Sequence, residues 1–272
     1  MKMKKRILQL TFAVLLLLCN NGFAQKITIG VKGGFSIPNL TGGSSDNPLN
    51  TGYSSRFAAD GGAYGEYHVT KKFSVTVGLE YSSQGGLKNK FQAFPTPIEL
   101  SSQFPGTVPQ YLYANFRSEA KINYILLPVL ARYTWKISKN SPIKVYAAVG
   151  PFAGYLLNAH QVTSGSSTIS MLNPGNANNP TYTQLSPQPI DFNANTSIKS
   201  DLYKFNAGIN GFVGISYNLT KQYSFFVEGG GNYGFLAIQK GSANGKNKTG
   251  AGVATFGFAY TMQNKYYRQG HR

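Results

Sequence analysis

Apolar and polar residues alternate strictly along two separate segments of the chain. In residues 27–37 and 73–84, every second side chain is large and apolar, and the residues between them are small, polar or charged. The apolar positions are Ile27, Ile29, Val31, Phe35 and Ile37 in the first segment, and Phe73, Val75, Val77, Leu79 and Tyr81 in the second. A period of two is the side-chain period of a β-strand. Both segments are therefore predicted to be strands with one apolar and one polar face.

Six further segments repeat this pattern less regularly. They are residues 56–69, 124–135, 143–157, 202–219, 223–235 and 250–262. Each carries Val, Ile, Phe or Tyr at alternate positions, with Gly, Asn, Lys or Glu between them. The chain is thus predicted to be all-β, with eight strands.

The connections between these segments alternate between long and short. Residues 70–72, 136–142 and 220–222 are short, whereas 38–55, 88–115, 158–200 and 236–249 are long and polar. Short turns at one end and long loops at the other are typical of outer-membrane barrels. We therefore predict an eight-stranded antiparallel up-and-down transmembrane β-barrel, with its apolar face toward lipid and both termini in the periplasm.

The first residues have the pattern of an export signal. Four basic residues within residues 2–6 precede an apolar run from Ile7 to Cys19, and small residues Gly22 and Ala24 precede Gln25. This run is too short to span a bilayer as a helix. We predict a cleaved signal peptide at 1–24, a barrel domain at 25–262 and a short periplasmic tail at 263–272. Cleavage would remove the single Cys, so no disulfide or thiolate site is expected.

Composition agrees with a membrane protein and gives the chain a basic character. Only 13% of the residues are charged, against about 25% in soluble domains. The formal net charge is +17, and the leader contributes four of these positive charges. The basic residues are dispersed, so nucleic acid is not an expected partner. Outer-membrane lipid is expected, and lipopolysaccharide phosphates are a possible partner for the loop lysines Lys88, Lys90, Lys240, Lys246 and Lys248.

Aromatic residues lie near the ends of several predicted strands. Tyr and Trp favour the membrane–water boundary, because the ring is apolar and its tip is polar. The residues expected at this boundary are Tyr53, Phe57, Phe73, Tyr133, Trp135, Tyr217, Tyr223 and Tyr260. The alternative is that they are ordinary core aromatics of a β-protein.

Charged residues fall on the polar face of most predicted strands. An isolated buried charge is costly, and the interior of an eight-stranded barrel is narrow enough for side chains to fill. We therefore expect an internal ion-pair network that plugs the lumen. Its predicted members are Lys32, Asp60, Glu66, Glu80, Arg132, Lys144, Lys204 and Glu228. A proton or ion path is the functional alternative.

Candidate catalytic residues are few. The three histidines, His68, His160 and His271, lie in different segments, and no His, Asp or Glu spacing resembles a zinc site. His160 is the only histidine expected near the outer rim. We expect no catalytic residue, no metal and no cofactor, and hence no enzyme.

Several motifs together resemble a known family. They are GVKGGFSIPNL, VGLEYSSQGG, INYILLPVLARY, VYAAVGPFAGYLL and EGGGNYGF, in this order from residue 30 to 235. The set is similar to the PorT-like outer-membrane β-barrel family of Gram-negative bacteria, and Asn123, Tyr124, Pro128 and Tyr133 match its most specific motif. Leu126 stands where that family often has Glu. The resemblance implies an eight-stranded barrel, and one group of the family is linked to protein secretion.

These observations favour a structural or interaction role for a monomeric outer-membrane barrel, with loops 38–55, 88–115 and 158–200 offering a surface to a protein partner. Three alternatives stay open. A narrow channel would conduct ions across a planar bilayer. An enzyme would lose activity when His160 or His68 is changed. A periplasmic lipocalin-like barrel would hold its apolar residues inside.

Overall fold

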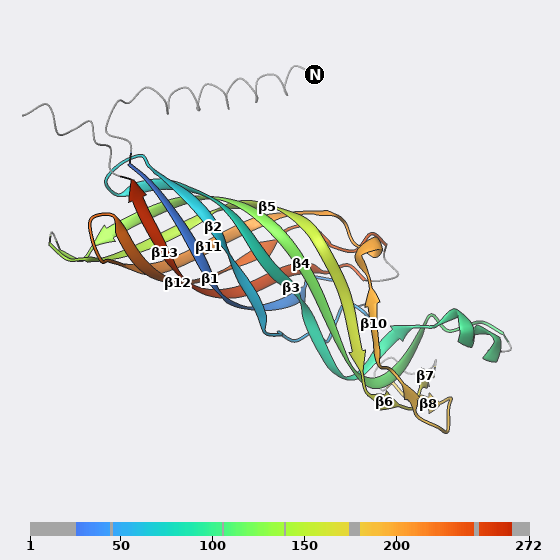
Figure 1. Ribbon diagram of the computed structural model, residues 1–272. Coiled ribbons are helices and arrows are strands. Elements are labelled where there is room, and N and C mark those ends of the chain that lie inside the picture. The colour runs from blue at the N-terminus through green and yellow to red at the C-terminus, as the bar shows by residue number, and fades with distance from the viewer. Residues whose placement is uncertain are drawn as a thin grey trace, which may run out of the picture.

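Eight long strands form a closed antiparallel barrel (Figure 1). The computed structural model describes residues 26–43, 46–104, 106–138, 140–173, 180–241 and 245–262. The predicted signal peptide at 1–24 and tail at 263–272 lie outside these residues. The barrel strands are β1 (Lys26–Thr41), β2 (Ala58–His68), β3 (Phe73–Pro95), β4 (Tyr111–Lys136), β5 (Ile143–Ser164), β11 (Phe205–Asn218), β12 (Tyr223–Gly234) and β13 (Lys248–Met262).

Each barrel strand pairs with the strand before it and the strand after it. The ring closes where β1 pairs with β13, with Ile27 opposite Met262. The short turns that follow β2, β4 and β11 lie at the same end as Lys26 and Met262, and the long loops lie at the other. This confirms the predicted eight-stranded up-and-down barrel.

The apolar face of the strands points outward. Val31 is 59% exposed and Val213 is 63% exposed, although both lie in the middle of strands. Leu79, Leu127, Ile215, Val227 and Phe256 are exposed in the same way. Exposed apolar side chains around a closed ring need hydrocarbon as their solvent. None of the helices that the structure describes is long and apolar enough to cross a membrane.

Inside the barrel, large aromatic side chains lie over glycines of the neighbouring strand. Tyr146 is opposite Gly214 in the β5–β11 register, and Phe226 is opposite Gly257 in the β12–β13 register. A Cβ at Gly214 would lie 2.4 Å from Tyr146 Cζ. The glycines therefore provide the space that lets a narrow barrel hold aromatic rings in its lumen.

Strands β3, β4 and β5 continue well beyond the lipid-facing surface, and Figure 1 shows them projecting at the end where β10 lies. The predicted loop 88–115 is wrong at both of its ends, because the pairing of β3 with β4 continues as far as Pro95 and Tyr111. Only residues 96–110 leave the ladder, and they include a 3-10 helix at Ile98–Gln103. In the strand residues on either side of it, the strict alternation of apolar residues is lost because they lie beyond the bilayer, although their backbone pairing continues.

The predicted long loop 158–200 is likewise partly ordered as strand. After β5 come β6 (Ser166–Ser167), β7 (Ser170–Leu172), β8 (Tyr182–Gln184), β9 (Ile190–Asp191) and β10 (Ala194–Ser197), and then a 3-10 helix at Lys199–Asp201. β7 pairs with β4, and β10 pairs with β5. This segment therefore extends the sheet edge of the projecting hairpins.

Aromatic residues surround the end of the barrel with the short turns, which we call the periplasmic end because outer-membrane barrels have short periplasmic turns. The rings of Tyr133 and Trp135 are 4.7 Å apart, and those of Tyr223 and Tyr260 are 5.2 Å apart. Tyr53 does not follow this prediction. It packs against the buried apolar cluster at the outer end, because its loop folds back over the barrel mouth.

Candidate functional site

A three-residue ion bridge crosses the lumen. Lys32 Nζ lies 2.8 Å from Glu80 Oε1 and 2.9 Å from Glu228 Oε1, and all three side chains are at most 9% exposed. Lys32 and Glu80 come from β1 and β3, and both pair with Gly62 of the intervening strand β2. Because Gly62 has no side chain, the two charged groups can meet across it.

Further donors satisfy the Glu228 carboxylate. Tyr146 Oη donates a 2.9 Å hydrogen bond to Glu228 Oε2, and Thr255 Oγ1 lies 3.2 Å from Oε1. Lys32 Nζ also lies 4.7 Å from the centre of the Phe212 ring. A buried ion pair is stable only when its remaining hydrogen-bonding groups are satisfied, and these contacts meet that need on the carboxylate.

A second ion pair lies nearer the periplasmic end. Arg132 Nη1 donates to Glu66 Oε2 at 3.1 Å, and Ser74 Oγ donates to Glu66 Oε1 at 2.6 Å. The Arg132 guanidinium stacks 3.5 Å from the Tyr146 ring centre. Tyr146 therefore contacts both ion pairs and joins them into one layer of side chains.

The other predicted lumen charges are placed differently. Asp60 is buried and accepts a hydrogen bond from Ser82 Oγ at 2.8 Å, with no cation within ion-pair distance among the described residues. Lys144 is half-buried near the periplasmic end. Lys204 is exposed, so its predicted lumen position is wrong. β11 begins at Phe205, and the alternation that places Asn206 inside does not extend one residue before the strand.

The histidines have structural partners. His68 Nε2 lies 3.0 Å from Thr28 Oγ1, and His68 Nδ1 lies 3.7 Å from Glu66 Oε1. His160 Nδ1 lies 3.1 Å from Asn195 Oδ1. His271 lies outside the described residues. Within the part of the chain that the structure describes, no group of three His, Cys, Asp or Glu side chains is arranged to hold a metal.

The outer mouth of the barrel is closed by apolar side chains and by loops. A buried cluster that includes Leu40, Ile122, Tyr124, Leu202 and Ile238 fills it. Hydrogen bonds between loops hold this end together: Asn50 Oδ1 accepts from the amide of residue 246 at 2.6 Å, and the Ile238 carbonyl accepts from the Tyr203 amide.

Above this cluster lies a cavity of about 150 Å³, which we call the outer vestibule. Its walls are formed about equally by apolar groups and by polar ones, among them Gln92, Ser118 and Gln161, and one cation, Lys88, faces it from β3. Burial lowers the pKa of Lys88 to about 8 and raises the pKa of the neighbouring Tyr53 to about 12. The sequence alone does not predict this site, because Lys88 is the first residue of the predicted polar loop 88–115 and a lysine there is expected to be exposed.

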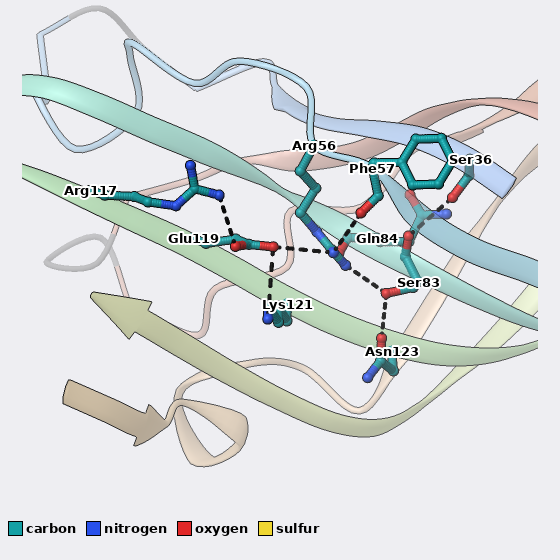
Figure 2. Close-up of polar contacts among 9 residues, drawn as sticks. All are labelled: Ser36, Arg56, Phe57, Ser83, Gln84, Arg117, Glu119, Lys121 and Asn123. Atoms are coloured by element: carbon teal, nitrogen blue, oxygen red, sulfur yellow. Dashed lines mark hydrogen bonds and ion pairs between the residues drawn. The ribbon is translucent and has the colours of Figure 1, made fainter. Parts of the chain in front are cut away.

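A second polar cluster fastens the loop between β1 and β2 to the outside of the barrel. Figure 2 shows Arg56 reaching across to β3 and β4. Arg56 Nη2 donates to Ser83 Oγ at 2.5 Å and to the Gln84 carbonyl at 3.0 Å, and Nη1 lies 3.5 Å from Glu119 Oε1. Burial lowers the pKa of Arg56, and Glu119 opposes that effect. Arg56 therefore serves as a clamp between loop and hairpin.

Two aromatic trios build the projecting part. The rings of Phe91, Tyr113 and Tyr182 lie within 5.9 Å of one another. The rings of Phe94, Phe116 and Phe192 form a second trio, in which Phe116 and Phe192 stack at 4.5 Å. Such contacts stabilise beyond simple area burial, so the residues after β5 are held against the β3–β4 hairpin.

A closed barrel with an apolar exterior and a charged, filled interior defines an integral outer-membrane β-barrel protein. The model of the family described as outer membrane protein beta-barrel domain matches residues 23–239. The chain belongs to this family, and it is an outer-membrane protein.

Solved bacterial outer-membrane barrels resemble the chain over most of its length. Neisserial surface protein A is 12% identical, with a TM-score of 0.38, and the match covers 88% of this chain and 97% of that one. OprG of Pseudomonas aeruginosa is 13% identical, with a TM-score of 0.34 and coverage of 89% and 97%. Ail of Yersinia pestis, solved with the heparin analogue sucrose octasulfate, is 9% identical, with a TM-score of 0.31 and coverage of 88% and 100%. None of the curated protein sequences compared with the chain matches it.

Proposed function

We propose that this protein is a non-conducting outer-membrane barrel that acts through the structure it presents outside the cell. The observation that carries this proposal is the Lys32–Glu80–Glu228 bridge in the lumen, together with the Arg132–Glu66 pair. These groups occupy the space that a conducting pore would need. The outward apolar stripes argue against the periplasmic lipocalin-like alternative, which would hold them inside.

Planar-bilayer recording tests the proposal against the narrow-channel alternative. We expect no conductance steps from the wild-type protein. The triple variant Lys32→Ala/Glu80→Ala/Glu228→Ala removes the bridge and is expected to give measurable conductance if it still folds, as judged by heat-modifiable migration on a gel. Steady conductance from the wild-type protein would show that it is a channel.

The proposed role is non-catalytic. His68 is engaged by Thr28 and Glu66, and the imidazole of His160 is engaged by Asn195. Peptide and phospholipid substrates incubated with the protein are therefore expected to turn over no faster than with the double variant His68→Ala/His160→Ala. Turnover that depends on either histidine would contradict a non-catalytic role.

We further propose that the protein has a role in protein secretion, as in the PorT-like family. It rests on the motif at Asn123, Tyr124, Pro128 and Tyr133. Deleting the gene and comparing the proteins released into the medium tests it. We expect exported proteins to accumulate in the periplasm, and unchanged secretion would count against the PorT-like assignment.

Lipopolysaccharide is the proposed lipid partner at the outer rim. Lys88 is withdrawn from the predicted contacts, because its side chain is buried in the vestibule. Arg117 and Lys121 are each 45% exposed on β4, on the stretch beyond the lipid-facing stripe, and Lys90 is exposed on β3. We expect the combined Lys90→Gln/Arg117→Gln/Lys121→Gln variant to retain less lipopolysaccharide phosphate on purification than Lys71→Gln/Lys72→Gln at the periplasmic turn. Equal retention would overturn this partner assignment.

A further inference from the structure

The outer vestibule has the walls of a ligand site. It is lined by Leu and Ile side chains from four parts of the chain and by the rings of Phe94 and Phe116, and exposed Asp201 and Pro95 lie at its edge. The buried cluster around Tyr124 and Leu126 lies between the vestibule and the ion bridge. The cavity is thus reached from outside the cell. Its volume of about 150 Å³ is large enough to admit a benzene ring.

Lys88 gives this cavity one positive charge. Lys88 is 5% exposed. Its Nζ donates a 2.9 Å hydrogen bond to the Leu49 carbonyl and lies 4.3 Å from the centre of the Tyr53 ring. Among the described residues, no carboxylate lies within ion-pair distance of Nζ. An ammonium group has three donors, so two are left for other acceptors. Burying a charge without a counter-ion is costly, and an anion in the vestibule would relieve that cost.

Ser118 supplies a second donor beside Lys88. The two residues are direct partners in the β3–β4 register, and both side chains point into the barrel. Ser118 Oγ accepts a 3.0 Å hydrogen bond from Gln161 Nε2, and its own hydroxyl proton has no acceptor among the described side chains. Cross-strand partners are about 5 Å apart at Cβ, so the two residues lie on the same wall of the vestibule.

We propose that the outer vestibule binds a small apolar carboxylate, with its acid group on Lys88 and Ser118 and its hydrocarbon or aromatic part among Phe116, Leu202 and Ile238. A neutral apolar ligand would leave the buried ammonium without a counter-charge. A long acyl chain would exceed the cavity volume. This proposal goes beyond the proposed function, because ligand binding in the vestibule does not depend on whether the lumen conducts.

The test uses 4-fluorobenzoate as probe and the folded full-length barrel in detergent micelles, followed by the fluorine NMR signal. We expect saturable binding to the wild-type protein and at least about tenfold weaker binding to Lys88→Met, because a hydrogen bond to a charged group is lost. Lys72→Met, which removes an exposed lysine in the turn after β2 at the opposite end of the barrel, is the control and should bind like wild type. Neutral 4-fluorobenzamide should bind at least about tenfold more weakly than the carboxylate.

A second measurement keeps the proposal falsifiable if Lys88→Met does not fold. Affinity for 4-fluorobenzoate should fall about tenfold from pH 7 to pH 9 in the wild-type protein, because Lys88 loses its charge over this range. The other titratable groups at the cavity are Tyr53 and Asp201, with Lys90 nearby on β3. Lys88→Gln and Ser118→Ala should also weaken binding.

Three results would overturn the proposal. The first is no saturable binding to the wild-type protein up to about 10 mM probe. The second is equal affinity in the wild-type and Lys88→Met proteins. The third is equal affinity for the carboxylate and the amide, which would show that the cavity recognises the apolar part alone.

Discussion

Lys32 is the residue on which the lumen bridge depends. Replacing it with Met leaves Glu80 and Glu228 buried and facing each other without a counter-charge. Breaking a buried ion pair by removing one partner costs about 3–5 kcal/mol. We expect Lys32→Met to lower the free energy of unfolding by that amount, measured by urea titration in lipid vesicles.

Two companion variants separate this effect from a general loss of charge. Lys72→Met, in the exposed turn after β2, should change stability by less than about 0.5 kcal/mol. Lys32→Met/Glu80→Gln/Glu228→Gln removes the charges together and should recover most of the loss. A loss in Lys32→Met no larger than that in Lys72→Met would show that the bridge does not stabilise the fold.

Lys88 makes the free energy of unfolding depend on pH in the alkaline range. Its pKa falls from 10.5 to about 8 on folding, so the unfolded chain binds more protons between these values. The free energy of unfolding therefore rises with pH across this range. Below about pH 8, Lys88 is protonated in both states and does not change the free energy of unfolding with pH. We expect the wild-type free energy of unfolding to rise relative to that of Lys88→Met by at most about 3 kcal/mol between pH 7.5 and 10.5. Parallel stability curves would contradict this.

Alternation along a strand could predict which face most residues occupy, but not their partners. It placed Lys32, Glu80 and Glu228 on the lumen face, yet these residues are far apart in sequence and meet only through the register of the closed ring. The pattern also failed where a strand ends, as at Lys204. Lys88 was missed because its charge suggested solvent, whereas its position in β3 turns it inward.

At the scale of the elements, Arg56 holds the loop between β1 and β2 onto the projecting hairpin. Gly85, beside the Arg56 guanidinium, has φ +123°, and a Cβ there would lie 1.9 Å from the Ala120 carbonyl oxygen. Glycine at this position therefore lets β3 approach β4 closely beside the clamp.

Replacing Arg56 with Met should release this loop. Its hydrogen bonds to Ser83 and Gln84 and its contact with Glu119 would be lost, and local opening would become easier. We expect limited proteolysis of intact cells to cleave residues 46–55 about tenfold faster than in wild type. Lys72→Met, which removes an exposed cation from the turn at the opposite end of the barrel, should leave the rate unchanged. Equal rates for Arg56→Met and wild type would show that the clamp does not hold the loop.

The sequence could predict the strands inside the bilayer and not their extension beyond it. From Phe73 to Tyr81, lipid requires an apolar residue at every second position. From Gln84 to Pro95, that requirement is absent, and the hairpin is held instead by backbone pairing and by the aromatic trios. Tyr182 and Phe192 come from the segment after β5, so the local periodicity of β3 and β4 cannot predict that they pack on this hairpin.

At the scale of the whole molecule, the lipid-facing surface gives a depth-dependent prediction. Val213 lies near the middle of β11 and Tyr217 lies near its periplasmic end, and both are exposed. Arginine at the bilayer midplane costs about 2–4 kcal/mol, and near the interface about 0–1 kcal/mol. We expect Val213→Arg to destabilise the barrel in vesicles by the larger amount and Tyr217→Arg by the smaller. A soluble barrel would tolerate both substitutions equally.

The length of β3 has a consequence for the cell envelope. The part of the strand beyond Tyr81 rises about 3.3 Å per residue and is tilted, so its tip stands roughly 30 Å clear of the hydrocarbon layer. Sugars attached to the outer leaflet occupy that height. A stiff, hydrogen-bonded stalk passes through such a coat without collapsing into it, and large molecules in the medium can therefore reach the residues at its tip while the rest of the barrel stays screened.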